Sequence, residues 1–230
     1  MEPTTPIDGS RVADLSRIWA VVPIRGLRTA KTRLSPDLDP AERLTLVTEM
    51  LRRTLVATRD AESIEGTVVV TLDPAVAGIA TAHRAVGLVD ILPGLNEAIL
   101  AARSLAVSRE ASAVLILPAD LPSVTAERLE ALVSEARGAL AGAADAGRGI
   151  PAHGLVAVVP DRHREGTNAL LVAPADLIEP DFGPGSGAAH RAAAAAVGAF
   201  YLEMDGPLTL DVDTPADLLL ASAALGAAGA

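Results

Sequence analysis

Short apolar runs alternate along the chain with longer segments of helical periodicity. Runs of mostly aliphatic, often β-branched residues predict strands, at residues 17–24, 67–73, 87–93, 112–118, 154–160 and 168–174. Between the first two runs, apolar residues from Leu44 to Leu55 recur on one helical face with arginines opposite them, which predicts an amphipathic helix. Further helices are expected over 95–110 and 125–137.

Two helix starts are marked by their capping residues. Asp39 can cap the first helix, Pro40 suits its first position, and Glu42 completes an arrangement close to a capping box. Thr214 and Asp217 repeat this pattern near the end of the chain and predict a second helix start.

Strands that alternate with helices indicate an α/β fold with a mostly parallel central sheet. The chain has 230 residues, enough for one such domain, which is expected over 17–230. The polar residues 1–16 are expected to form a disordered lead-in. The segment 138–151, rich in Gly and Ala, is expected to be a loop between the two halves of the domain.

Charge and composition exclude several classes of function. The net charge of −10 disfavours nucleic acid and anionic membranes as partners, because both select for basic surfaces. The chain has no cysteine, which excludes disulfides and thiolate catalysis. Its start lacks a signal-peptide pattern, and no apolar run approaches the length of about 20 residues of a membrane span. A cytoplasmic protein is therefore expected.

The apolar run 112–118 leads to Asp120, which lies between two prolines. Ligands of open α/β sheets bind at the carboxyl ends of the strands, so this carboxylate is placed for chemistry. The alternative is a turn residue without a ligand.

A cluster of cations follows the first strand, at Arg25, Arg28, Lys31 and Arg33. In an acidic protein, such a cluster before a helix indicates an anion, and above all a phosphate. The segment matches neither the P-loop nor the dinucleotide-binding glycine pattern, which also disfavours a dehydrogenase. The alternative is a solvated basic loop.

Two further segments carry candidate chemistry. Asp211 and Asp213 alternate along an expected strand end and would share one face, where a cation could separate them, although both could simply face solvent. The segment 183–191 combines glycines with an expected helix start and indicates a second anion site, at Gly183, Gly185, Ser186, Gly187, His190 and Arg191. Its alternative is a glycine turn with a serine cap and a structural histidine.

These motifs predict two phosphate pockets with carboxylates between them. Mg²⁺ binds through few carboxylates together with substrate phosphate oxygens, so one acid from each of two strand ends would suffice. A phosphate monoester is already ionised at neutral pH and needs no activating base.

The chain from Trp19 to Leu220 resembles the phosphoenolpyruvate or 2-phospho-L-lactate guanylyltransferases of coenzyme F-420 biosynthesis. The segments that carry the resemblance are, in order, "VVPIRGLRTAKTRL", "GLNEAI", "LPADLP", "EGTNALLV", "FGPGSGAAH" and "DVDTPADL". The resemblance implies a three-layer nucleotidyltransferase fold of the glycosyltransferase-A or Rossmann-like type. It also implies that Mg²⁺ and GTP bind and that GMP is joined to the phosphate of a three-carbon acid.

The resemblance also implies a role for individual residues. Lys31, Asp120 and Asp213 would be catalytic, with Asp120 and Asp213 as metal ligands and Asp211 as the alternative second ligand. The nucleotide would contact Arg25, Gly26, Lys31, Arg33 and Asn96, although Asn96 could instead be a helix N-cap. The phosphorylated acid would contact Thr167, Gly183, Ser186 and His190.

Phosphoenolpyruvate is the favoured acid, and 2-phospho-L-lactate and 3-phosphoglycerate remain alternatives. The resemblance implies that the product passes to the next transferase of the pathway, and a homodimer is compatible with it. Two other functions stay open: transfer to another acceptor, such as the molybdenum cofactor or a sugar phosphate, and nucleotide binding without catalysis.

Overall fold

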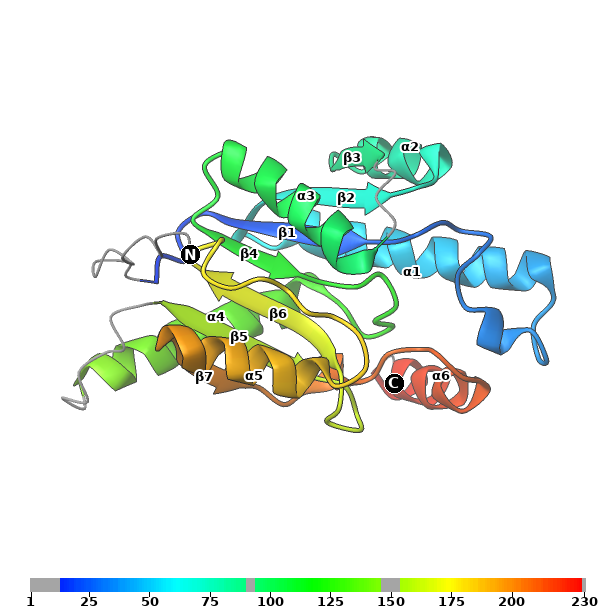
Figure 1. The fold of residues 1–230 in the computed structure, drawn as a ribbon. Helices are drawn as coiled ribbons and strands as arrows, with labels where there is room; N and C mark the ends of the chain where they lie inside the picture. The colour runs from blue at the N-terminus through cyan, green and yellow to red at the C-terminus, as the bar shows by residue number, and fades with distance from the viewer. Residues whose placement is uncertain (1–12, 90–93, 146–153, 229–230) are drawn as a thin grey trace, which may run out of the picture.

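A seven-stranded sheet forms the centre of the molecule (Figure 1). The computed structural model describes residues 13–89, 94–145 and 154–228. The strand order is β3-β2-β1-β4-β6-β5-β7. The strands are β1 (Ile18–Pro23), β2 (Ile64–Thr71), β3 (Val86–Val89), β4 (Ala113–Ile116), β5 (Leu155–Pro160), β6 (Thr167–Ala173) and β7 (Phe200–Glu203).

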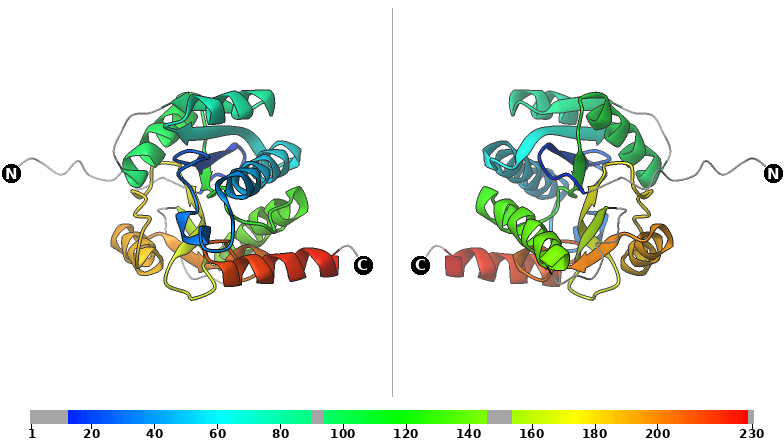
Figure 2. Two further views of the ribbon diagram at one scale, coloured as in Figure 1. Left: turned by 90° about the vertical axis from the view of Figure 1, so that its right-hand side faces the viewer. Right: turned by 90° about the vertical axis from the view of Figure 1, so that its left-hand side faces the viewer.

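Helices cover both faces of the sheet, which gives three layers (Figure 2). The helices are α1 (Pro40–Asp60), α2 (Pro74–Ala82), α3 (Leu95–Ser108), α4 (Ala126–Asp145), α5 (Ser186–Val197) and α6 (Pro215–Ala228). Apolar residues of α1 and α4 pack on one face, and those of α3 and α5 pack on the other. The expected three-layer α/β fold is confirmed.

The alternation of side chains along β1 explains how one strand supports both layers. Ile18 and Ala20 lie in the core under α1 and α4, whereas Trp19 and Val21 lie in the core under α3 and α5. All four are buried, as expected for a central strand covered on both sides.

The sheet is mostly parallel, but β6 runs antiparallel to both of its neighbours. In the register with β4, Val114 pairs with Val172 and Ile116 with Leu170. The beginning of β6 therefore lies beside the carboxyl end of β4. This reversal brings residues 167 and 168 to the edge where β1 and β4 end.

The predicted cap of α1 is confirmed. The Asp39 carboxylate accepts hydrogen bonds from the backbone N–H groups of Ala41 (2.7 Å) and Glu42 (2.9 Å). The Glu42 carboxylate accepts one from the N–H of Asp39 (2.8 Å). Because Pro40 follows directly, α1 starts at the position that its sequence predicts.

Several sequence-based boundaries were wrong. The helix α4 continues to Asp145, because the alanines of the expected loop favour a helix over a turn, and 146–151 lie outside the described residues. Residues 210–213 form a connection without regular secondary structure and not a strand end. The short elements α2 and β7 were not predicted, since each is too brief for a clear period.

The chain before β1 is described only from residue 13. Residues 1–12 of the expected lead-in, like 90–93 of the expected third strand, lie outside the described residues. Leu15 is buried in the core, so this part of the lead-in packs on the domain. Within the described ranges, no helix is both long enough and apolar enough to cross a bilayer.

We predict that Asp39→Ala lowers the free energy of unfolding by about 1 kcal/mol, because two N–H groups of α1 lose their acceptor. Urea unfolding followed by the fluorescence of Trp19, the single and buried tryptophan, measures the loss. Asp37→Ala is the control, since this exposed residue lies outside the cap. Equal stability of the two variants would contradict the capping role.

Candidate functional site

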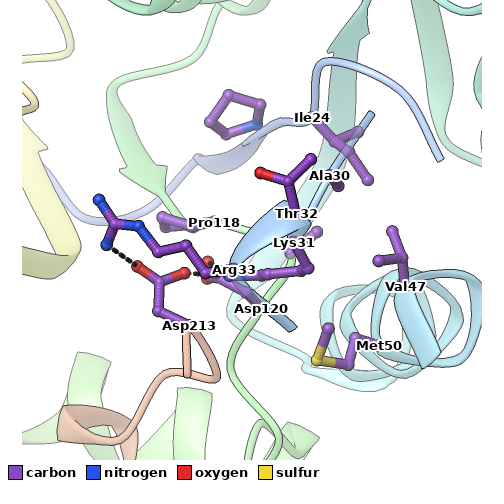
Figure 3. A pocket seen from close by; sticks show the side chains of 12 residues that line it. Ile24, Ala30, Lys31, Thr32, Arg33, Val47, Met50, Pro118, Asp120 and Asp213 are labelled. Atoms are coloured by element: carbon purple, nitrogen blue, oxygen red, sulfur yellow. Dashed lines mark hydrogen bonds and ion pairs between the residues drawn. The ribbon is translucent and has the colours of Figure 1, made fainter. Parts of the chain in front are cut away.

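A cavity of about 330 Å³ opens at the carboxyl ends of β1 and β4 (Figure 3). One wall is apolar and includes Val47 and Met50 of α1. The opposite wall is charged and carries Lys31, Arg33, Asp120 and Asp213. The cavity lies at the edge of the sheet that the position of Asp120 predicts.

Asp120, Asp211 and Asp213 form a carboxylate cluster at this cavity. Each offers an oxygen, and these oxygens lie within 4.8 Å of one another. The backbone N–H of Val212 donates to the carbonyl of Asp120 (3.1 Å), which ties the two segments together. Sequence reasoning left Asp211 and Asp213 as alternatives, whereas the fold brings both to Asp120.

The ammonium group of Lys31 lies between two of these carboxylates. Its Nζ is 2.6 Å from Oδ2 of Asp120 and 2.6 Å from Oδ1 of Asp213. Burial by itself lowers the pKa of Lys31, but the charges and hydrogen bonds of Asp120 and Asp213 outweigh it and the net pKa shift is upward. Lys31 therefore carries its charge, and the side chain is only 10% exposed.

The cluster still has an excess of negative charge. Burial raises the pKa of Asp211, and the charges of Asp120 and Asp213 add to this effect. One ammonium compensates only one of the three carboxylates when all are ionised. The donor set, made of carboxylate oxygens, suits a hard divalent cation.

The backbone around Asp213 is held by Asp217. Its Oδ2 accepts from the N–H of Asp213 (3.2 Å), the N–H of Thr214 (2.7 Å) and the hydroxyl of Thr214 (2.8 Å). Arg162, in the turn between β5 and β6, pairs with its Oδ1 (2.7 Å). The predicted capping pair of Thr214 and Asp217 is thus confirmed. Arg162 was missed, because nothing in its local sequence points to a partner 55 residues away.

The other cations of the predicted cluster differ in how close they lie to the cavity. Arg33 lines it and lies 3.8 Å from Asp213, but its side chain is 77% exposed. Arg25 and Arg28 are exposed and are not among the lining residues, and Gly26 packs near Asp73. Lys31 is therefore the cation around which the cavity is built.

The second predicted anion site is organised by buried side chains and less by free backbone donors. The N–H of Ser186 donates to the Gly183 carbonyl (3.1 Å), and that of Gly187 donates to the Glu165 carbonyl (3.2 Å). These donors of the α5 start are therefore already used. The hydroxyls of Thr167 and Ser186 lie 3.2 Å apart, and Nδ1 of His190 lies 3.0 Å from that of Thr167.

His190 is buried and neutral. Burial lowers the pKa of His190 to about 4, against a smaller opposing effect of Asp181. Arg191, expected beside it at the anion site, instead pairs with Glu203 and is exposed. The structure thus separates two neighbours that the sequence groups together, because successive helical residues point in different directions.

Asn96 joins the start of α3 to the loop that precedes α5. Its Nδ2 donates to the carbonyl of Phe182 (3.1 Å), and its Oδ1 accepts from the N–H of Phe182 (2.8 Å). The N-cap of α3 is Gly94 and not Asn96. The amide that was expected to touch a nucleoside here holds the loop that leads to Gly183.

Asn168 joins the hydroxyl pair to the carboxylate cluster. Its Nδ2 donates to the carbonyl of Leu208 (3.1 Å) and lies 3.5 Å from Oδ1 of Asp211. Its neighbour along β6 is Thr167. The segment "EGTNALLV" contains Asn168, but nothing in it points to a partner 43 residues away.

Comparison with known proteins identifies a family. Residues 18–221 match the family described as guanylyl transferase CofC like. A phosphoenolpyruvate guanylyltransferase of Sphaerobacter thermophilus is 40% identical over 200 residues, which cover 86% of this chain and 89% of that protein. One of Rubrobacter xylanophilus is 38% identical over 203 residues, which cover 87% and 91%.

Solved structures of other proteins share this fold. A putative nucleotide-diphospho-sugar transferase of Desulfovibrio desulfuricans has a TM-score of 0.65 at 13% identity, covering 87% of this chain and 84% of that one. The 4-diphosphocytidyl-2C-methyl-D-erythritol synthase of Anaerococcus prevotii has a TM-score of 0.57 at 11% identity, covering 93% and 98%. The fold is therefore that of the nucleotidyltransferases.

We predict that His190 makes the protein less stable as the pH falls from 6.5 towards 4. The unfolded chain protonates this group near its ordinary pKa of 6.5, whereas the folded protein takes up the proton only near pH 4. Acid therefore favours unfolding, by about 3 kcal/mol at most.

Urea unfolding at several pH values measures this slope. His190→Leu should be less stable at neutral pH but should lose less stability between pH 6.5 and 4 than the wild type does. His163→Leu, at an exposed histidine, should keep the slope of the wild type. An unchanged slope in His190→Leu would refute the assignment.

Proposed function

The chain belongs to the CofC-like guanylyltransferase family, and we propose that it joins GMP from GTP to the phosphate of phosphoenolpyruvate, releasing pyrophosphate. We place this reaction in coenzyme F-420 biosynthesis. The observation that carries the proposal is the Lys31 ammonium between Asp120 and Asp213, at the ligand-binding edge of a nucleotidyltransferase fold. The names of the relatives support phosphoenolpyruvate over 2-phospho-L-lactate and 3-phosphoglycerate.

The reaction requires charge stabilisation and positioning, and no activating base. An ionised phosphate oxygen of the acid forms a bond to the α-phosphorus of GTP, while the bond to the oxygen that bridges to the β-phosphorus breaks. Lys31 and Arg33, which line the cavity, would neutralise the negative charge of the departing pyrophosphate. The apolar wall formed by Val47 and Met50 restricts water on one side of the cavity.

Asp120, Asp211 and Asp213 would hold a divalent cation, and Mg²⁺ fits this oxygen donor set. Such an ion, when bound, neutralises negative charge on the phosphates. Lys31 compensates part of the charge of the cluster without it.

The acid would be seated at the start of β6. Thr167 and Ser186 provide hydroxyls, and the backbone at Gly183 is open, because nothing lies within 4 Å of the position that a Cβ would take there. We further propose that the product, a mixed anhydride of two phosphates, passes to the next transferase of the pathway.

We predict pyrophosphate release from GTP and Mg²⁺ that depends on phosphoenolpyruvate. The assay offers 2-phospho-L-lactate and 3-phosphoglycerate in parallel, ATP and CTP in place of GTP, and the next transferase with its deazaflavin acceptor to remove product. Release with phosphoenolpyruvate and GTP alone supports the proposal. Release that no acid stimulates, even with the acceptor system, contradicts it.

We predict that Lys31→Met lowers turnover by about 100- to 1000-fold, because a positive charge at the reacting phosphates is lost. The same variant should bind Mn²⁺ more tightly in the absence of nucleotide, since the ammonium no longer competes for Asp120 and Asp213. Electron paramagnetic resonance of free Mn²⁺ measures this affinity.

Arg28→Met is the matched control, because it removes an exposed cation of the same loop outside the cavity. Both properties of this control should resemble those of the wild type. Wild-type turnover in Lys31→Met would refute the catalytic role of Lys31, and an unchanged Mn²⁺ affinity would refute the competition.

A further inference from the structure

A buried chain of hydrogen bonds joins the loop before α5 to the start of β6. The backbone N–H of Asp181 donates to Nε2 of His190 (3.0 Å), and the other ring nitrogen faces Oγ1 of Thr167. The hydroxyl of Ser186 faces the same oxygen. His190, Thr167 and Ser186 are 0%, 7% and 3% exposed, so bulk water does not complete their hydrogen bonding.

The N–H of Asp181 determines which nitrogen of His190 carries the proton. A backbone N–H can only donate, so Nε2 must be the unprotonated acceptor. Because the ring is neutral, its single proton is on Nδ1. His190 therefore donates to Oγ1 of Thr167 and cannot accept from it.

This tautomer decides what the hydroxyl pair offers to a ligand. Three hydrogens can be donated: the one on Nδ1 of His190 and the hydroxyl hydrogens of Thr167 and Ser186. The two hydrogen bonds that join these groups use two of the three. One hydroxyl hydrogen is left to donate outwards. With the proton on Nε2 instead, the Thr167 hydroxyl would donate to the ring, the Ser186 hydroxyl would donate to Thr167, and no hydrogen would remain.

We propose that His190 is a positioning residue that keeps the Thr167–Ser186 hydroxyl pair as a donor towards an anionic oxygen of the acid substrate. This inference rests on the proposed function. An anionic oxygen is the partner that a leftover donor in a buried site favours, because such hydrogen bonds are the strong ones.

The surroundings hold this chain in place. Asn96 fixes both backbone groups of Phe182, the residue after the Asp181 N–H that sets the tautomer. The Phe182 ring packs edge-on against the imidazole, with ring centroids 5.1 Å apart. Gly187 permits close contact with the β5–β6 turn, because a Cβ there would lie 3.3 Å from the Gly166 carbonyl. The donor is thus oriented before a substrate binds.

The tautomer can be read without any substrate. Two-bond ¹H–¹⁵N spectra of imidazole-labelled protein at neutral pH distinguish a proton on Nδ1 from one on Nε2. The proposal expects the Nδ1–H form for His190 and uses His163, which is exposed, as the internal reference. A His190 ring that carries its proton on Nε2, or on both nitrogens, overturns the proposal whatever the substrate is.

Kinetics then test the donor. His190→Leu leaves one hydroxyl hydrogen free but removes the Nδ1 donor that orients the pair, so it should raise the KM for phosphoenolpyruvate by about 3- to 10-fold, the effect of one neutral hydrogen bond. The KM for GTP should stay nearly unchanged. His163→Leu should change neither constant. A rise in both KM values together, or a loss of kcat alone, would assign His190 a purely structural role and overturn the proposal.

A second pair of variants tests the proposal even if His190→Leu does not fold. Thr167→Val, which removes the hydroxyl, should raise the KM for the acid at least as much as His190→Leu does, whereas Thr167→Ser, which keeps the hydroxyl, should raise it less. If no acid supports the reaction, the proposed function fails. The role of the hydroxyl pair can then still be tested, by measuring calorimetrically how tightly phosphoenolpyruvate binds to the wild type and to Thr167→Val. Equal affinity then overturns the role of the hydroxyl pair.

Discussion

The contact on which the site depends is the partly buried ammonium of Lys31 between the carboxylates of Asp120 and Asp213. Like charges gathered at one edge of a sheet would repel, and each would lose favourable hydration on burial. Lys31 contacts two of them but supplies only one positive charge, and burial together with the charges of Asp120 and Asp213 raises the pKa of Asp211. An acidic protein thus keeps a positive group beside its carboxylate cluster, and the proposed phosphate and cation sites meet there because both respond to the same local charge.

The reversed strand β6 unites the two ends of the site. In an entirely parallel sheet, Thr167 and Asn168 at the beginning of a strand would lie at the opposite edge from Asp120. Antiparallel pairing with β4 instead places them beside the cluster, where Asn168 reaches Asp211 and Thr167 reaches α5. One change of strand direction therefore brings a hydroxyl donor and a carboxylate cluster to the same edge.

Residues behind the reacting groups determine how rigidly these are held. Asp217 and Arg162 fix the backbone at Asp213, and Asn96 fixes the backbone at Phe182. These contacts join segments far apart in the chain, so both ends of the proposed site are oriented by the packing of the whole domain. Donors and charges that are already oriented need little reorganisation during the reaction, which is the main way in which such a site accelerates phosphoryl chemistry.

The sequence by itself determined the elements and their chemistry. Apolar runs and caps such as Asp39 and Thr214 act within a few residues, so they predicted most strands, the start of α1 and α6, and the position of Asp120 at a strand end. Only the tertiary structure decided which groups meet. Lys31 contacts Asp120 and Asp213 across 89 and 182 residues, β6 runs backwards, and the amide of Asn96 pairs with Phe182. Local propensity carries no information about such pairings, because they arise from strand order and from the packing of helices onto the sheet.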